Sequence, residues 1–233
     1  LSVSDYVITE AGFGVDLGAE KFLDIKCRVG NFKPAAMVIV VTKRAIEHHE
    51  YANGLQMIVN YCKMLNNTYG IPVIVAINKF ANDNIEDLYK IKDVFEFYNI
   101  SCEICSSWED GSNGAEHLAK AVIKKSNEQY QLNFAYDTNM STVEKIEAIV
   151  NKVYGIKKIE YEDQILKKQI ESINIDDFYI CIAKTPFSIS SDPNKLGHVK
   201  DDFEIKITDI DVLYGAKIIR IHCGKMYFMP GLP

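Results

Sequence analysis

Three aromatic residues, Phe13, Phe80 and Trp108, are the residues of this chain best suited to hold a flat ligand. Each of them follows an apolar run and stands beside small or polar residues. Aromatic faces in such a place suit stacking on a heterocyclic ring. An isolated Phe or Trp is more often part of a hydrophobic core. The residue types alone leave both interpretations open.

A second candidate is the pair Asn78-Lys79, which ends the branched apolar run at Ile71–Ile77. With Asp83, the pair is similar to the Asn-Lys-x-Asp loop that reads purine rings in GTP-binding proteins, although the spacing is two residues longer. The chain contains no G-x-x-x-x-G-K-[ST] sequence, whose backbone cradles a triphosphate. Either the chain does not bind ATP, or the cradle lies in a part of the protein outside these residues. A GTPase-like protein is therefore the weakest of the functions considered.

Composition argues against several other classes. Cys102 and Cys105 form a C-x-x-C sequence, but residues three apart on a strand point to opposite faces, and no second pair or nearby His completes a zinc set. We therefore expect no metal site. The net charge of -6 and the pI near 5.4 argue against broad nucleic-acid binding, and no run reaches the length of a membrane span. Six cysteines without a secreted framework favour a reduced, cytoplasmic location.

Strand and helix patterns alternate through the first half of the chain. This alternation predicts an α/β fold with a mostly parallel sheet flanked by helices. The central strand is the apolar run that stops at Asn78, because such a run is typical of a strand buried on both faces. Asp16 is suited to capping the first helix. The other predicted strands are Tyr6–Thr9, Ala36–Val41 and Ile100–Cys105, and the predicted helices are Asp16–Lys26, Leu55–Leu65, Ile85–Tyr98 and Ala115–Lys125.

The carboxyl ends of parallel strands meet at one edge of a sheet, where open α/β folds bind their ligands. We call this edge the rim. Four segments are expected to converge there, namely Glu10–Gly14, Thr42–Arg44, Asn78–Phe80 and Ser106–Trp108. The two glycines of the first segment would let its backbone approach a ligand closely.

Beyond Asn127 the pattern changes to a smaller α+β region. Ser141–Glu144 is a capping-box sequence that opens a helix to about Val153. We expect the chain to divide into residues 1–127, part of a large α/β domain, and residues 128–233. It has no initiator Met and opens on a strand pattern, so we also expect a piece of a longer polypeptide. A second helix is predicted at about Tyr161–Ile173, with strands at Phe178–Ala183, Phe203–Ile207 and Lys217–Ile221.

Several longer motifs resemble one enzyme family, formate–tetrahydrofolate ligase, also called formyltetrahydrofolate synthetase. They occur in the family's order, and the resemblance covers nearly the whole chain. The motifs are TEAGFGVDLGAEKFLDIKCR at 9–28, KPAAMVIVVTKRA at 33–45, PVIVAINKF at 72–80, the single Trp108, AKTPFSISSDPNKLG at 183–197, and MPGLP at 229–233.

The resemblance implies an ATP-dependent, ADP-forming ligase that joins formate to tetrahydrofolate through formyl phosphate, with Mg²⁺ accompanying ATP. It implies a large domain of the P-loop type, whose phosphate loop lies in an N-terminal half absent from these residues. The chain alone is then expected to be inactive, and its partners are that half and further copies in a homo-oligomer. No catalytic residue is assigned. The residues that the resemblance implies for substrate or nucleotide binding are Glu10, Phe13, Gly14, Asn78, Phe80 and Trp108.

The chain also departs from the family's pattern. Glu109-Asp110 follows Trp108 where the family usually has Ala-Lys, and Pro186 stands in place of the Gln of a Lys-Thr-Gln-Tyr segment. Reversing charge beside a site for anionic ligands is unfavourable. The alternative to a ligase is therefore a non-catalytic folate- or nucleotide-binding or interaction module derived from the family.

Overall fold

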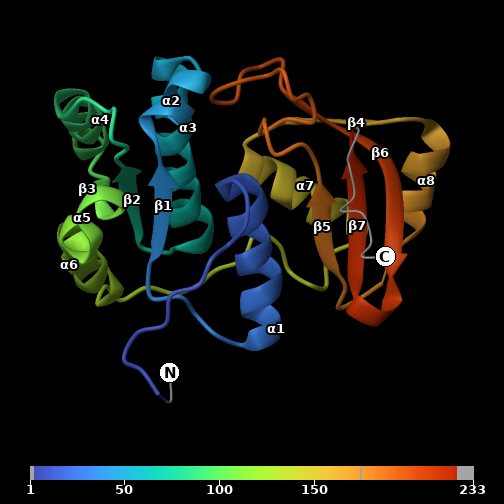
Figure 1. Cartoon of the computed structure of the whole chain (residues 1–233). Helices are drawn as coiled ribbons and strands as arrows, with labels where there is room; N and C mark the ends of the chain where they lie inside the picture. The colour runs from blue at the N-terminus through green and yellow to red at the C-terminus, as the bar shows by residue number, and fades with distance from the viewer. Residues whose placement is uncertain (1–2, 174, 225–233) are drawn as a thin grey trace, which may run out of the picture.

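The first of two β-sheets is parallel and built around the predicted central strand (Figure 1). The structure is a computed structural model that describes residues 3–173 and 175–224, so the MPGLP motif lies outside the described residues. The sheet has the order β1 (Met37–Val41), β2 (Val73–Asn78), β3 (Ser101–Cys105). Residues 73–77 of β2 are all buried. This confirms that the branched run reflects a strand covered on both faces.

Helices connect and cover these strands. They are α2 (Lys43–His48), α3 (Tyr51–Met64), α4 (Ile85–Phe97), α5 (Ser107–Asp110) and α6 (Glu116–Ser126). The side chains of Thr42 and Asn84 start α2 and α4 by accepting hydrogen bonds from the N–H groups of Ala45 and Glu86, at 3.0 and 2.9 Å. α4 and α6 pack against β2 and β3.

The second sheet is mixed and has the order β4-β6-β7-β5. β4 is parallel to β6, β5 is parallel to β7, and β6 and β7 are antiparallel. The sequence pattern did not indicate β4. Helix α7 opens with the predicted capping box, in which Ser141 and Glu144 bond each other's backbone N–H groups. The elements are β4 (Lys158–Tyr161), β5 (Tyr179–Ala183), β6 (Glu204–Leu213), β7 (Ile218–Cys223), α7 (Thr142–Ile149) and α8 (Gln164–Ser172).

A helical segment at Val15–Gly30 stands between the two sheets (Figure 1). It consists of π-helical turns at Val15–Ala19 and Phe22–Cys27, followed by α1 (Arg28–Gly30). Its buried apolar side chains, including Leu23 and Cys27, belong to one hydrophobic cluster that contains residues of both sheets. The segment therefore joins the two halves of the chain through a shared core.

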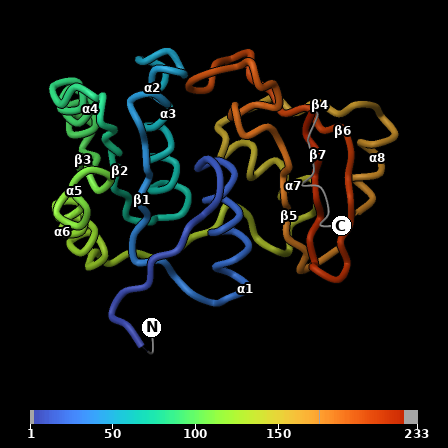
Figure 2. The backbone as a smooth tube through the Cα atoms, viewed as in Figure 1, coloured from blue at the N-terminus to red at the C-terminus, as the bar shows by residue number. Residues whose placement is uncertain are grey.

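The predicted strand Tyr6–Thr9 is wrong. This stretch is exposed and pairs with no strand in the described part of the chain. A short apolar run becomes a strand only when a neighbouring strand accepts its backbone hydrogen bonds. Figure 2 traces the stretch, drawn in blue from the N label, as a tube without helical turns until the segment at Val15 begins.

Candidate functional site

Parallel register brings the ends of three strands together at the rim. Val41 of β1 lies beside Ile77 of β2, and Asn78 of β2 lies beside Cys105 of β3. The segments that follow these strands, at 42–44, 78–80 and 106–108, therefore leave the sheet on the same edge, as expected. Asn78 itself is the half-buried last residue of β2. Three of the four predicted segments thus share one place in the fold.

Phe80 stands on a tight turn at this rim. The Asp83 carboxylate accepts a hydrogen bond from the Phe80 N–H at 2.8 Å, and the Asp83 N–H donates to the Phe80 carbonyl at 3.0 Å. The phenyl ring is on the outside of this turn, since 48% of Phe80 is exposed. Asp83 is therefore engaged in fixing the turn. That role accounts for Asp83 without a purine ligand.

Trp108 lies on the single turn of α5, and 78% of it is exposed. The core interpretation is therefore wrong for Trp108 in the described chain. The Ser106 hydroxyl donates to the Asp110 carboxylate at 2.7 Å, and the Ser106 N–H donates to the Gly114 carbonyl at 3.0 Å. A side chain at Gly114 would collide with Ser106, because an added Cβ would lie 2.5 Å from its carbonyl carbon. These contacts fix the backbone on which the indole stands.

The two aromatic turns are joined by Lys79. Its backbone N–H donates to the Cys105 carbonyl at 2.9 Å, which extends the pairing of β2 and β3 by one bond. Its ammonium group forms an ion pair with the carboxylate of Glu109, the residue after Trp108. Of the two acidic residues that depart from the expected family pattern, Glu109 is thus neutralised by a neighbour on the rim.

The segment Glu10–Gly14 is exposed and folds back on the start of the helical segment. The Gly14 carbonyl accepts hydrogen bonds from the N–H groups of Leu17 and Gly18, at 3.1 and 2.8 Å. Phe13 has a φ of 63° and is 85% exposed. Among the described residues, no hydrogen bond or ion pair joins Glu10, Phe13 or Gly14 to Phe80 or Trp108. Because the expected strand before this segment is missing, sheet register does not place it on the rim.

A buried polar cluster runs along the helical segment, and the sequence analysis missed it. Asp16 does not cap the segment; its carboxylate accepts a hydrogen bond from the Tyr61 hydroxyl at 3.2 Å and pairs with the fully buried Lys184. Asp24 accepts from the Tyr69 hydroxyl at 2.7 Å. The signal was the four-residue spacing of Asp16, Glu20 and Asp24, which places three acids on one helical face.

Glu20 is the least compensated member of this cluster. It is fully buried, its Oε2 atom lies 3.1 Å from the Lys21 ammonium, and its Oε1 atom has no hydrogen-bond partner among the described residues. Burial raises the pKa of Glu20 to about 7. Between pH 4.5 and pH 7 the folded chain therefore holds a proton that the unfolded chain releases.

We expect this proton to make stability fall as pH rises from about 4.5 to 7. The contribution of Glu20 protonation to the free energy of unfolding is fully present below the Glu20 pKa of the unfolded chain. It is lost once the pH passes the Glu20 pKa of the folded chain. The loss is about 3 kcal/mol, at roughly 1.4 kcal/mol per pKa unit. Glu20→Gln should remove this part of the slope and be more stable than the parent at pH 8. Urea unfolding at pH 5 and pH 8 measures this pH dependence of the free energy of unfolding, and the variant Glu86→Gln, at an exposed position, is the control. An identical pH slope for Glu20→Gln and the parent would refute it.

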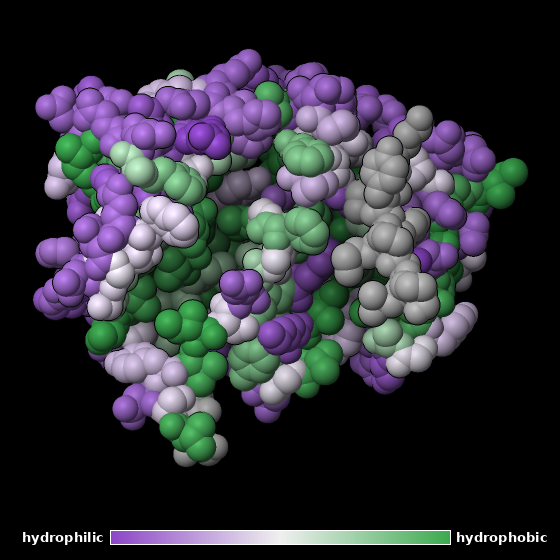
Figure 3. Space-filling view, in the orientation of Figure 1, coloured by the Kyte–Doolittle hydropathy of each residue, from purple (hydrophilic) through white to green (hydrophobic). Residues whose placement is uncertain are grey.

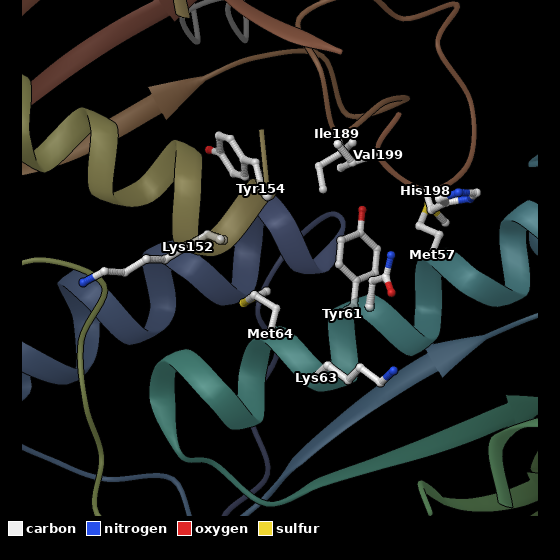
Figure 4. Close-up of a pocket in the computed structure, with 12 residues that line it drawn as sticks. Met57, Tyr61, Lys63, Met64, Lys152, Tyr154, Ile189, His198 and Val199 are labelled. Atoms are coloured by element: carbon white, nitrogen blue, oxygen red, sulfur yellow. The ribbon is translucent and has the colours of Figure 1, made fainter. Parts of the chain in front are cut away.

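One pocket lies away from the rim, between α3, residues 152–155 after α7, and residues 189–199 (Figure 4). Its volume is about 260 Å³. The Tyr61 hydroxyl beside it is already bonded to Asp16. The rest of the lining is mixed: apolar side chains such as Met57, Met64 and Ile189 lie beside the polar side chains of Asn60, Lys63, Lys152 and His198. Because this pocket lies away from the strand ends, where open α/β folds bind their ligands, the rim remains the candidate site.

Two features are not found among the described residues, a cluster of metal ligands and a membrane-spanning helix. No group of three or more His, Cys, Asp or Glu side chains there is arranged to hold a metal ion. Burial raises the pKa of the Cys102 thiol to about 12, so that this side chain is a protonated thiol at neutral pH. No helix among them is long and apolar enough to cross a membrane.

Comparison with known proteins connects this geometry to one family. Residues 1–233 match the family described as formate–tetrahydrofolate ligase. A protein of Campylobacter concisus (strain 13826) named formate–tetrahydrofolate ligase is 38% identical over 249 residues. The match covers the whole of this chain and 45% of that protein. The chain thus spans less than half the length of this curated relative.

Proposed function

Because the chain belongs to the formate–tetrahydrofolate ligase family, we propose that its rim binds the pterin or adenine ring of a ligase that joins formate to tetrahydrofolate. The observation that carries the proposal is the pair of exposed aromatic side chains, Phe80 and Trp108, on two fixed turns at the carboxyl edge of a parallel sheet. Exposed aromatic faces lose unfavourable contact with water when a flat ring covers them. Phe13, Glu10, Gly14 and Asn78 are proposed as further binding residues.

The proposed reaction has two steps. A formate oxygen attacks the γ-phosphorus of ATP, which gives formyl phosphate and ADP. The N10 amine of tetrahydrofolate then attacks the formyl carbon, phosphate leaves, and the nitrogen loses a proton. In such phosphoryl transfers the protein acts mainly by positioning and by neutralising charge. The contribution of the described residues is to bind and orient the ring system.

Phosphate binding is proposed to lie outside this chain. The sequence has no Gly-rich loop ending in Gly-Lys-Ser or Gly-Lys-Thr. The described residues also offer no carboxylate cluster for the Mg²⁺ ion that accompanies ATP. These residues therefore do not fit a triphosphate site, and we propose that an N-terminal half of the enzyme supplies it. In this proposal residues 1–127 are part of a large domain of the P-loop type. Residues 128–233 form the smaller region.

The surface of the molecule supports a partner on the side of β1. Figure 3 shows apolar side chains, coloured green, gathered over β1 and the N-terminal stretch. Val40 of β1 and Val7 and Ile8 before the helical segment are exposed. Contiguous apolar surface of this kind is typical of an interaction site. We propose that the N-terminal half of the enzyme covers it, in a cytoplasmic protein that forms homo-oligomers.

The second candidate function is a non-catalytic folate- or nucleotide-binding module. It is favoured by Glu109 and Asp110 next to Trp108, since acidic residues oppose an anionic ligand. The Lys79–Glu109 ion pair neutralises one of the two charges. Binding without turnover, in the chain assembled with its N-terminal half, would identify the module.

Phe80→Ala tests the proposed ring site. Stacking on an aromatic side chain contributes about 1–3 kcal/mol in nucleic-acid systems, so the variant should bind tetrahydrofolate or ADP roughly tenfold more weakly, at 1.4 kcal/mol per factor of ten. Equilibrium dialysis with the chain assembled with its N-terminal half measures the affinity. The control is Phe97→Ala, an exposed Phe at the last turn of α4 and therefore at the opposite edge of the sheet. Equal affinities of Phe80→Ala and the parent for both ligands would refute the site.

A further inference from the structure

We propose that Lys79 and Glu109 are positioning residues that hold the Trp108 turn in register with the Phe80 turn, so that the two rings form one receiving surface. This inference rests on the proposed function. It assigns a role in the site to Glu109, an acidic residue that departs from the expected family pattern. The argument depends on what fixes α5, on which Trp108 stands.

Lys79 fastens both ends of the segment that carries Trp108. Its N–H binds the carbonyl of Cys105, the last residue of β3, at 2.9 Å. Its ammonium group pairs with Glu109, one residue beyond Trp108. The two side chains are partly shielded from water, at 18% and 34% exposure. Because Lys79 directly precedes Phe80, any movement of the Trp108 turn is coupled to the turn that holds Phe80.

Little else holds the indole in place. α5 has four residues, which is too short to be a stable helix alone. The Trp108 side chain is mostly exposed, so core packing does not fix it. The remaining contacts run from Ser106 to Asp110 and to Gly114, in the turn before α6, and from the Cys105 thiol at the end of β3 to the Ser107 hydroxyl at 3.5 Å. The Lys79–Glu109 pair is therefore the side-chain contact that ties this turn to the end of β2.

The inference predicts that Glu109 supports ring binding, although it is acidic. If Glu109 merely repelled an anionic ligand, Glu109→Gln would bind more tightly. If Lys79 contacted the ligand directly, Lys79→Gln would lose affinity and Glu109→Gln would not. If the pair acts as a tether, both variants lose affinity, and the double variant is no worse than either. These three patterns are distinct.

The experiment uses the chain assembled with its N-terminal half and measures tetrahydrofolate affinity by equilibrium dialysis. Partly exposed ion pairs contribute up to about 1 kcal/mol, so each single variant should bind about three- to fivefold more weakly. The charge exchange Lys79→Glu with Glu109→Lys should recover part of the loss. With any Trp of the N-terminal half replaced by Phe, the fluorescence anisotropy of Trp108, the single Trp of the chain, should fall in both single variants without ligand, because the turn moves more freely.

The control is Lys92→Gln, which breaks the Lys92–Glu103 pair of 2.8 Å between α4 and the middle of β3. That pair has similar exposure, at 20% and 28%, so the control should leave affinity and anisotropy unchanged. Tighter tetrahydrofolate binding by Glu109→Gln would overturn the inference, and so would affinity and anisotropy equal to those of the parent in both single variants. In either case Phe80→Ala still tests the ring site independently. Failure of the parent itself to bind tetrahydrofolate or ADP would overturn the inference and the proposed function together.

Discussion

Lys184→Met is expected to destabilise the chain by about 3–5 kcal/mol, the cost of leaving a buried charge without its partner. Lys184 is fully buried, pairs with Asp16 and donates to the Ser188 carbonyl. Burial lowers the pKa of its ammonium group, while Asp16 opposes that shift. Removing Lys184 leaves the Asp16 carboxylate with the Tyr61 hydroxyl as its only side-chain donor among the described residues.

The double variant Asp16→Leu with Lys184→Met separates loss of charge balance from loss of packing. Replacing both members of a buried pair by apolar residues is often neutral or stabilising, so the double variant should be much more stable than Lys184→Met alone. Free energies of unfolding in urea at pH 7 provide the comparison. Two results would show that this pair does not organise the interior. One is a loss in the free energy of unfolding below about 1 kcal/mol for Lys184→Met. The other is a loss for the double variant that equals the sum of the losses for Asp16→Leu and Lys184→Met.

The second large effect concerns turnover. The 233-residue chain alone should release no ADP in response to formate and tetrahydrofolate, because an unneutralised γ-phosphate deprives the first step of its main electrostatic help. Addition of the proposed N-terminal half should restore ADP release. A coupled assay for ADP, with formate omitted as the control, measures both. Turnover by the isolated chain at the rate of a full-length relative would contradict the assignment of the phosphate site to another part of the enzyme.

Local patterns were sufficient to predict the elements of the first sheet. The branched run at Ile71–Ile77 and the strands at 36–41 and 100–105 correspond to β2, β1 and β3 within a few residues. The helix predicted at Ile85–Tyr98 corresponds to α4, and the capping box marked α7. Parallel topology then predicted which strand ends meet. These features depend on residues close together in sequence.

The predictions that failed depend on partners far away in the chain. Tyr6–Thr9 has a strand pattern but no neighbouring strand, and β4 is a four-residue strand that exists because β6 lies beside it. The pairing of Asp16 with Lys184 joins residues 168 positions apart. Glu109 was interpreted as an uncompensated charge, since nothing in its local sequence indicates Lys79 as its partner. Sequence spacing can indicate a buried acidic face, but only the tertiary structure identifies what neutralises it.

The most direct test of the ring site uses the emission of Trp108, since it is the single tryptophan of the chain. In the chain assembled with the proposed N-terminal half, in which any Trp is replaced by Phe, saturating tetrahydrofolate or ADP should quench or shift this emission and protect the indole from iodide, because a stacked ring covers its exposed face. Binding is established independently by equilibrium dialysis, and emission is corrected for absorption by the ligand. Saturation by both ligands with unchanged emission and unchanged iodide quenching would contradict the claim that the rim receives the ring.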